Sequence, residues 1–485
     1  MGGVMEHLSW TGALGFLNWP FLALVMATLA AHILRVATSI FVTRVAAPAE
    51  LNGTVSTGRG ITAHVGTAAK WTFRALIALT LIFIVGGAFL NLHAGIIGGV
   101  SRRLLPVWIA LVVLFAASIR WKGRLGLYGT LFNSNGGMIG LALVMFWAFT
   151  GIFVAMGMIA THDPLAPISA MIPVPPGSPV RTPLADGIYP HHLLGADAMA
   201  RDVFTRMVTG ALEVLRIAPL ATLVAFTVGI TLGLPAGYLG GRVDTVLSFV
   251  SNFFLAFPAI LLFILLVTPE VAATGIPNYL AMVLFAFPIF LLTALFNTRL
   301  RMQPRRRSVV VSVILLIGIW ACLSLISQPG TAIRILPSAV DPLDIPGHQL
   351  LIFASIVIVI APAVFGHMRG LAQRIAPRAF VTAARMRGET RWYIMLWEVL
   401  PNARGLLIAD FFARTGHANI LLGALGVLGL GLGPDSPDWG SSIGEGFNLL
   451  GEFPHLALPP ALALLSFVLG LNLIAEALRQ EDRPE

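Results

Sequence analysis

Long apolar runs dominate the chain, and most have the length that crosses a membrane as one α-helix. A helical span needs about 20 residues, because a helix rises about 1.5 Å per residue through a hydrocarbon core about 30 Å thick. The pattern predicts an all-α polytopic membrane protein with about 11 spans. The runs are Thr11–Leu34, Ala75–Ser101, Leu104–Ile119, Leu125–Thr161, Ile217–Gly241, Thr245–Pro269, Val271–Thr298, Ser308–Ile333, Gln349–Gly366, Leu406–Leu428 and Leu456–Ala475.

Composition supports the membrane class. Hydrophobic residues make up 57% of the chain and charged residues 11%, less than half of the roughly 25% found in soluble domains. So little charge excludes a soluble enzyme and a disordered chain, and the single cysteine, Cys322, excludes an intrachain disulfide scaffold. The apolar runs are continuous rather than alternating, which is not typical of a transmembrane β-barrel. The longest runs exceed one helix length, so we expect them to contain turns.

Basic residues predict the orientation. The chain has 31 Lys and Arg against 22 Asp and Glu, an excess that marks cytoplasmic loops in a membrane protein, so no nucleic-acid partner is expected. With Arg120–Arg124 placed inside, alternation also puts Arg35–Arg74, Arg299–Arg307 and His367–Arg404 inside. This predicts an outer N-terminus and a cytoplasmic C-terminus, although the pair Arg102–Arg103 then falls outside.

No catalytic set or metal site is predicted. The sequence has no HExxH, CxxC or Walker A pattern, and His191–His192 reads as loop surface. Asp410 and Arg414 are spaced i, i+4 in an otherwise apolar run, where they can pair within the membrane. Two interpretations stay open: a polar lining of a substrate path, or an ion pair near the cytoplasmic end of the helix.

One cytoplasmic stretch carries a distinct pattern, PRAFVTAARMRGETRWYIMLWEVLP, from Pro377 to Pro401. Small residues at Ala383 and Ala384 precede a break at Gly388, which predicts two short helices around a glycine. Two short helices flanked by basic residues fit a groove on the surface of a cytoplasmic partner. A helical hairpin that lies on the membrane surface without a partner is the alternative.

This stretch resembles the signature of permease subunits of binding-protein-dependent ABC importers: EAA, three residues, Gly, nine residues, Ile, one residue, Leu-Pro. The resemblance implies that the loop docks the ATPase subunits. Thr382 replaces the family's Glu and Glu398 its Ile, which bears on the strength of docking. The matching places are held by Thr382, Ala383, Ala384, Gly388, Leu400 and Pro401.

Further motifs resemble the C-type permease of dipeptide, oligopeptide and nickel importers. They follow the family patterns HPLGTDxxGRDVxSRxxxGAR, GYxGGxxD and LGLGxxPPTPSWG in the same order along the chain. The matching candidate residues are Gly195, Asp197, Arg201, Asp202, Arg206, Gly237, Tyr238, Gly240, Gly241, Asp244, Trp439 and Gly440.

The resemblance implies a division of the chain. Residues 1–136 form an N-terminal extension with about three extra transmembrane helices, and residues 137–485 form the six-helix type I importer domain. A two-helix insertion at about 271–348 interrupts that domain, and 367–404 is the cytoplasmic coupling loop.

The implied function is that of a multi-pass permease subunit, not an enzyme, moving di- or oligopeptides across the bacterial cytoplasmic (inner) membrane. The implied partners are a second permease, two ATPases and an external substrate-binding protein, with lipid around the spans. ATP and Mg²⁺ would sit on the ATPases, with no cofactor on this chain. Transport of nickel or another small solute is the alternative substrate, and a non-transport scaffold or a secondary transporter is the alternative class.

Overall fold

The computed structural model describes residues 7–41, 56–160, 162–168, 173–180, 190–326, 347–432 and 436–481. The regular structure of these residues is helical except for one antiparallel pair, β1 (Ser178–Pro179) with β2 (His191–His192). The predicted all-α membrane class is confirmed. The chain divides into two compact units: Met1–Trp108 with Pro167–Phe204, and Ile109–Ala166 with Thr205–Glu485.

A pair of long helices forms most of the first unit. The 3₁₀ turn η1 (Gly12–Leu17) leads into α1 (Asn18–Phe41), and α2 (Ser56–Leu90) packs along α1. The turn η4 (Asn91–Ala94) then leads into α3 (Gly95–Arg103). The predicted run Ala75–Ser101 is therefore not one straight helix.

The outer faces of this helix pair are apolar. Trp19 is 79% exposed and Phe89 85% exposed, an arrangement that would be unfavourable in water over so large an area. Their small shared core contains Leu14 and Phe83, with Phe21 edge-on to Phe83 at 5.6 Å between ring centroids. The exposed apolar faces are consistent with lipid as the surrounding solvent.

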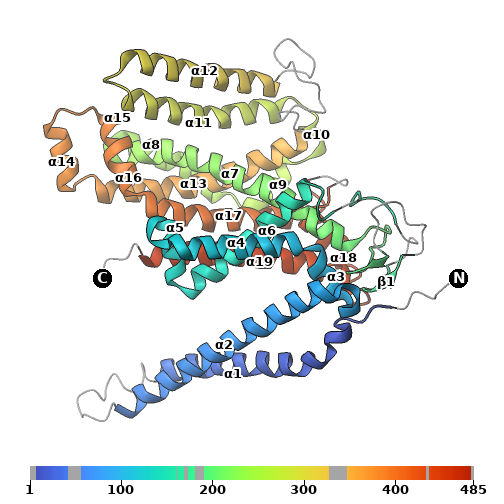
Figure 1. Ribbon diagram of the computed structural model, residues 1–485. Helices are drawn as coiled ribbons and strands as arrows, with labels where there is room; N and C mark the ends of the chain where they lie inside the picture. Colours follow the sequence, from blue (N-terminus) through green and yellow to red (C-terminus); the bar gives the residue numbers. More distant parts are fainter. Residues whose placement is uncertain are drawn as a thin grey trace. The chain divides into compact units, whose positions relative to one another are not determined.

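The remaining helices follow in chain order, and Figure 1 labels most of them. They are α4 (Leu105–Trp121), η5 (Lys122–Arg124), α5 (Leu127–Thr130), η6 (Leu131–Asn133), α6 (Asn135–Ala155), α7 (Val203–Leu239), α8 (Gly241–Ala256), α9 (Ala259–Leu266), α10 (Pro269–Ala272), α11 (Ile276–Arg299), α12 (Pro304–Ile326), α13 (Gly347–Ile375), α14 (Ala379–Met386), α15 (Arg391–Tyr393), the π-helical turn η7 (Ile394–Val399), α16 (Leu400–Asn402), α17 (Arg404–Val427), α18 (Trp439–Phe447), η8 (Pro454–Leu456) and α19 (Leu458–Glu481).

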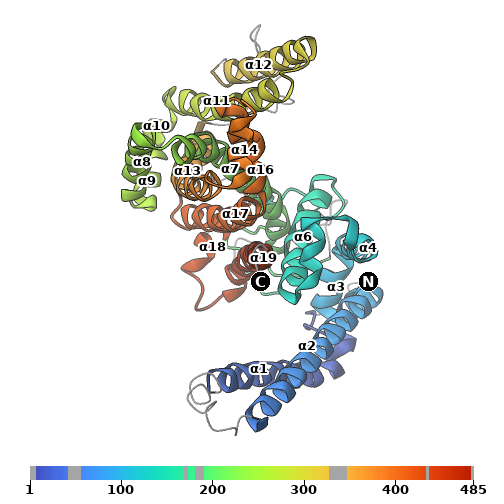
Figure 2. The same cartoon turned by 90° about the vertical axis from the view of Figure 1, so that its left-hand side faces the viewer.

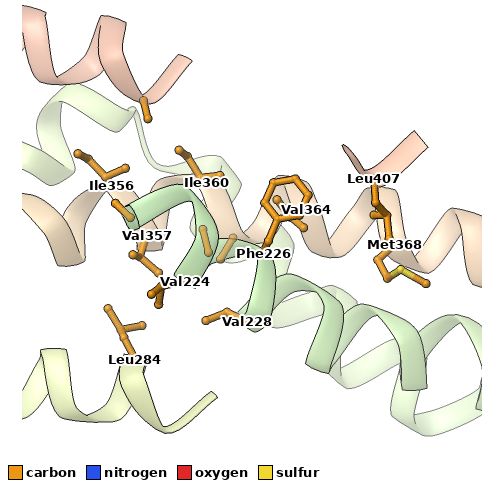
Figure 3. Packing of buried hydrophobic residues seen from close by; sticks show 14 of the residues in the cluster. Val224, Phe226, Val228, Leu284, Ile356, Val357, Ile360, Val364, Met368 and Leu407 are labelled. Carbon is orange, nitrogen blue, oxygen red and sulfur yellow. The ribbon is translucent and has the colours of Figure 1, made fainter. Parts of the chain in front are cut away.

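The largest core of the second unit lies between α7 and α13 (Figure 3). Val224 and Val228 of α7 belong to this cluster with Ile360 and Val364 of α13, and the cluster continues to α11 and α17. Glycines on α7 allow the close approach, because a Cβ at Gly233 would lie 2.6 Å from the carbonyl oxygen of Phe365. Small residues at such contacts let helix backbones pack closely within a membrane.

Nine helices of the described residues are long and apolar enough to cross a membrane, and ten if one bent pair counts as a span. That pair is α8 and α9, which meet at 83°, so the predicted run Thr245–Pro269 is broken near Phe257–Pro258. The helix α17 has 24 residues but carries Arg404, Asp410 and Arg414. The number of 11 spans therefore stays a prediction.

The two helices predicted for the insertion are α11 and α12, which lie side by side (Figures 1 and 2). The chain between α12 and α13, residues 327–346, lies outside the described residues. The predicted boundaries at 136 and at 271–348 rest on the family resemblance and stay predictions.

Candidate functional site

The candidate coupling loop follows α13, which continues to Ile375, so the predicted bounds 367–404 include the last turns of that helix. Its first helix, α14, buries Val381 and Ala384 against η7 and leaves Thr382 exposed. Ala383 is half-buried. Val381 and Ala384 thus pack α14 against η7. The opposite face of α14 is exposed and can bind another protein.

Gly388 separates the two halves of the loop. Its φ of +77° lies in the left-handed region, where side chains with a Cβ are strained. A Cβ there would meet no other atom within 4 Å, so the backbone angle, not space, requires glycine. The amide nitrogen of Glu389 then donates to the carbonyl of Ala384 at 3.3 Å, which ends the helix.

The second half of the loop is a π-helical turn between two short helices. The Thr390 hydroxyl caps α15 by accepting the Tyr393 amide at 3.3 Å. Within η7, Ile394, Met395, Leu396 and Val399 are buried. Leu400 is half-buried and Pro401 exposed, so the closing Leu-Pro pair lies where the chain leaves the loop for α17.

The two departures from the family pattern fit into the loop. Glu398 accepts from the Arg387 guanidinium, with Arg387 NH2 to Glu398 Oε1 at 3.1 Å. This ion pair joins the two halves of the loop across Gly388. Thr382 stands on the exposed face with Met386, which is 79% exposed. Both substitutions are therefore compatible with a folded loop.

The last turn of α7 also contacts the coupling loop. Arg385 Nε donates to the Tyr238 hydroxyl at 3.1 Å, and its guanidinium lies 5.0 Å from the centroid of the same ring. The sequence placed Tyr238 in one motif and Ala383–Gly388 in another. In the structure these two motifs touch.

Glycines and a carboxylate form a corner at this turn. Gly240 and Gly241 have φ of +65° and +58°. Asp244 then receives two hydrogen bonds from Arg369 of α13, at Oδ1 and, 2.6 Å away, at Oδ2. A Cβ at Gly237 would collide with the Arg369 carbonyl oxygen. The motif residues Gly237, Gly240, Gly241 and Asp244 thus hold α7 and α8 against α13, and Arg369 is a partner that sequence reasoning missed.

Asp410 lies at the centre of a charged cluster. Its side chain is 4% exposed, and Arg414 Nε lies 3.4 Å from Oδ2, as the i, i+4 spacing predicts. His367 Nδ1 of α13 is closer, at 3.0 Å, and Arg479 NH2 of α19 lies 3.8 Å from Oδ1. The carboxylate therefore joins three helices instead of making one pair on α17.

The motif around residues 195–202 builds a self-supporting loop in the first unit. Asp197 accepts from the amides of Met199 and Arg201 at 2.9 Å each, and Arg201 Nε lies 2.7 Å from its other oxygen. Gly195 has a φ of +88°. Asp202 pairs with His192, whose Nδ1 lies 3.3 Å away. His192 is buried in β2, so its predicted place on a loop surface is wrong. Hydrogen bonds and ion pairs among these residues therefore hold the loop in its conformation.

Three motif residues form packing contacts in the second unit. Arg206 NH1 lies 2.7 Å from Glu445 Oε2. Trp439 is fully buried, donates its indole N–H to the Met207 carbonyl at 2.7 Å, and lies edge-on to Trp147. A Cβ at Gly440 would lie 2.6 Å from the Gly423 carbonyl oxygen. Among the described residues, no three His, Cys, Asp or Glu side chains gather as a metal site.

Comparison with known proteins supports the motif pattern. Residues 229–480 match the family model described as "Binding-protein-dependent transport system inner membrane component". The glutathione transport system permease protein GsiD of Pectobacterium atrosepticum is 26% identical over 302 residues, which is 62% of this chain and 75% of that protein.

Two further relatives have similar names. The dipeptide transport system permease protein DppC of Alkalihalophilus pseudofirmus is 25% identical over 68% of this chain and 82% of its own length. The probable D,D-dipeptide transport system permease protein DdpC of Escherichia coli K12 is 24% identical over 66% and 78%, respectively. The family match covers more than half of the chain, and the chain therefore belongs to the family of inner membrane components of binding-protein-dependent transport systems.

Proposed function

We propose that this chain moves di- or oligopeptides into the cell as one permease subunit of an ABC importer. Family membership makes it a multi-pass inner-membrane transport subunit rather than an enzyme. The names of its relatives, which refer to dipeptides and glutathione, support a peptide substrate.

The exposed face of α14 is the observation that carries the proposal. Val381 and Ala384 are buried on the inner side, while Thr382, Met386 and Arg387 are exposed on the outer side. An exposed apolar side chain flanked by basic residues suits a groove with acidic rims on a partner protein. In this proposal the groove belongs to an ATPase subunit.

The proposed assembly contains a second permease, two ATPases and an external substrate-binding protein. ATP and Mg²⁺ are held by the ATPases, since this chain has no Walker A sequence. ATP must bind one arrangement of the ATPases more tightly than the other to shift the permease between inward and outward states. The loop around Gly388 passes that shift to α7 and α13.

The proposed orientation has the N-terminus outside and the C-terminus inside. One contact supports it: Arg301, in the link between α11 and α12, lies 3.5 Å from Glu389 of the coupling loop. The basic link and the coupling loop are thus on one side, as the positive-inside rule expects.

Peptide uptake tests the proposal. A strain that lacks the gene is complemented with the natural chain, with Met386→Glu, or with the control Met199→Glu. Met199 is also an exposed methionine, 55% exposed, but belongs to the first unit. We expect Met386→Glu to abolish uptake of labelled dipeptide and Met199→Glu to retain it. Equal uptake by both variants would contradict the docking role of α14.

A further inference from the structure

The inserted helix α11 contacts the coupling loop through side chains that lie far apart in sequence. Trp397 Nε1 of η7 donates to the Thr298 hydroxyl at 2.9 Å. The Arg299 guanidinium lies 4.6 Å from the centroid of the Trp397 ring. Thr298 therefore binds the edge of the Trp397 ring, and Arg299, the next residue of α11, lies over its face.

The hydroxyl that receives Trp397 is itself fixed. Thr298 Oγ1 donates to the carbonyl of Ala294 at 2.8 Å within α11. Its hydrogen is thus engaged, and its lone pair is directed outward to accept the indole N–H. This hydrogen bond fixes the position of the Trp397 ring relative to α11, which an apolar contact alone would not do.

Two weaker contacts extend the same interface. Arg301 NH1 lies 3.5 Å from Glu389 Oε2, and the ring of Phe290 lies edge-on to Trp392 at 6.0 Å. A cavity of about 430 Å³ lies among these residues. Besides the apolar cluster to which both elements belong, separate polar and aromatic side-chain contacts around a cavity thus join the helix and the loop, and single substitutions can remove these contacts.

We propose that α11 is a brace that fixes the coupling loop, with Thr298 and Arg299 as positioning residues that act through Trp397. The inference rests on the proposed function of the loop. The loop is also attached through the apolar cluster that contains Val381, Ala384 and the buried side chains of η7, and through Arg385, which donates to the Tyr238 hydroxyl. The contacts at α11 add a further attachment, which makes the loop move with the helices of the second unit when a partner pushes it.

The brace gives a role to part of the insertion. The helices α11 and α12 are those of the insertion predicted at about 271–348, and α11 also packs along α13. Force applied to the loop therefore has a second route into α13, through Trp397 and α11.

The coupling ratio tests the brace. The full importer, reconstituted in lipid vesicles, is assayed for dipeptide transported per ATP hydrolysed. Thr298→Val removes the acceptor for Trp397 while keeping the side-chain shape, and Thr298→Ser restores the hydroxyl. The matched control is Thr293→Val, since the Thr293 hydroxyl on the same helix makes no hydrogen bond to the described residues.

We expect the combined variant Thr298→Val with Arg299→Ala to lower the coupling ratio by about fivefold to tenfold, the effect of losing a net hydrogen bond and a cation–π contact. The ATPase subunits should stay bound, and Thr298→Ser and Thr293→Val should keep the natural ratio. A natural ratio in the combined variant would overturn the brace. Absence of any bound ATPase on the natural chain would instead overturn the proposed function of the loop.

A distance measurement tests the brace without the ATPases. In a Cys322→Ser background, spin labels are placed by Met302→Cys and Met386→Cys, at side chains 86% and 79% exposed. We expect one narrow distance distribution, broadened by the combined variant and unchanged by Thr293→Val. A broad distribution in the natural background, or a narrow one in the combined variant, would overturn the proposal.

Discussion

Arg369 of α13 holds Asp244 of α8 with two hydrogen bonds, one to each carboxylate oxygen. The two residues are 125 positions apart in sequence. Ser248, one turn along α8, donates a third hydrogen bond to the same carboxylate at 3.0 Å. The pair fixes the corner between α7 and α8, next to Tyr238, which contacts the coupling loop.

Because Arg369 contacts both oxygens of Asp244, we expect that lysine at position 369 will not give the same stability as arginine. Arg369→Lys keeps the charge but cannot form the two-pronged contact. Because Arg369 is 35% exposed, we expect a loss of only about 1 kcal/mol in the free energy of unfolding. The measurement is thermal unfolding in detergent. The exchange of charges in Arg369→Asp with Asp244→Arg should recover part of the loss caused by Arg369→Asp alone, and no recovery would contradict the pairing.

The Asp410 cluster predicts the outcome of a charge exchange. Since His367 and Arg479 also lie within 4 Å of the carboxylate, Asp410→Arg with Arg414→Asp would place an arginine against both of them. We therefore expect the double exchange to stay as destabilised as Asp410→Arg alone.

Removing the Arg414 side chain should lower the free energy of unfolding less than reversing the charge at Asp410. Arg414→Ala leaves His367 and Arg479 beside Asp410, and we expect a loss of less than about 1 kcal/mol in the free energy of unfolding, the range of partly exposed ion pairs. Thermal unfolding of the variants provides the comparison. Full recovery in the double exchange would show that Asp410 and Arg414 act as an isolated pair.

At Gly388, we expect the loss of uptake to depend on how poorly the substituted residue tolerates a positive φ. Asparagine tolerates the left-handed region better than other residues with a Cβ, and a β-branched residue tolerates it least. We expect Gly388→Asn to retain most uptake and Gly388→Val to lose it, with about 1–2 kcal/mol of strain. Membrane insertion of both variants is the control. Equal uptake would mean that the loop does not need this turn.

Asp438 predicts a pH dependence of stability. Burial raises the pKa of its carboxyl, although hydrogen bonds from Ser441 act in the opposite direction. The folded state then holds its proton more tightly than the unfolded state, so stability falls as pH rises from the ordinary pKa to the raised one.

Asp438→Asn tests this pH dependence. The amide oxygen can still accept the Ser441 amide at the start of α18, where the present distance is 2.9 Å. We expect the melting temperature of the natural chain to fall as pH rises above about 4, and we expect the variant to lose this fall. An unchanged slope would assign the pH dependence to other groups.

The sequence predicted well those features that depend on neighbouring residues. Continuous apolar runs located the helices, and Gly388 marked the turn within the loop because its effect is local. The family patterns located residues such as Trp439 and Gly240. Where a run was longer than one helix, as in Thr245–Pro269, the sequence did not locate the 83° bend.

Partners distant in sequence were not predictable. The spacing of Asp410 and Arg414 reveals a pair on one helix, but His367 approaches from α13 and Arg479 from α19. Thr298 and Trp397 are 99 positions apart, and neither residue type alone indicates a contact. Such pairs depend on how the helices pack, which a single sequence without homologues does not encode in a readable pattern.

Affinity purification of the tagged chain from native membranes, followed by mass spectrometry, tests whether this chain is a subunit of an ABC importer. We expect one or two ATPase subunits and a second permease to co-purify with the natural chain in mild detergent. We expect Met386→Glu to lose the ATPases but to keep the second permease. A natural chain that repeatedly purifies alone would contradict the importer function and would identify Thr382 and Glu398 as marks of a lost coupling.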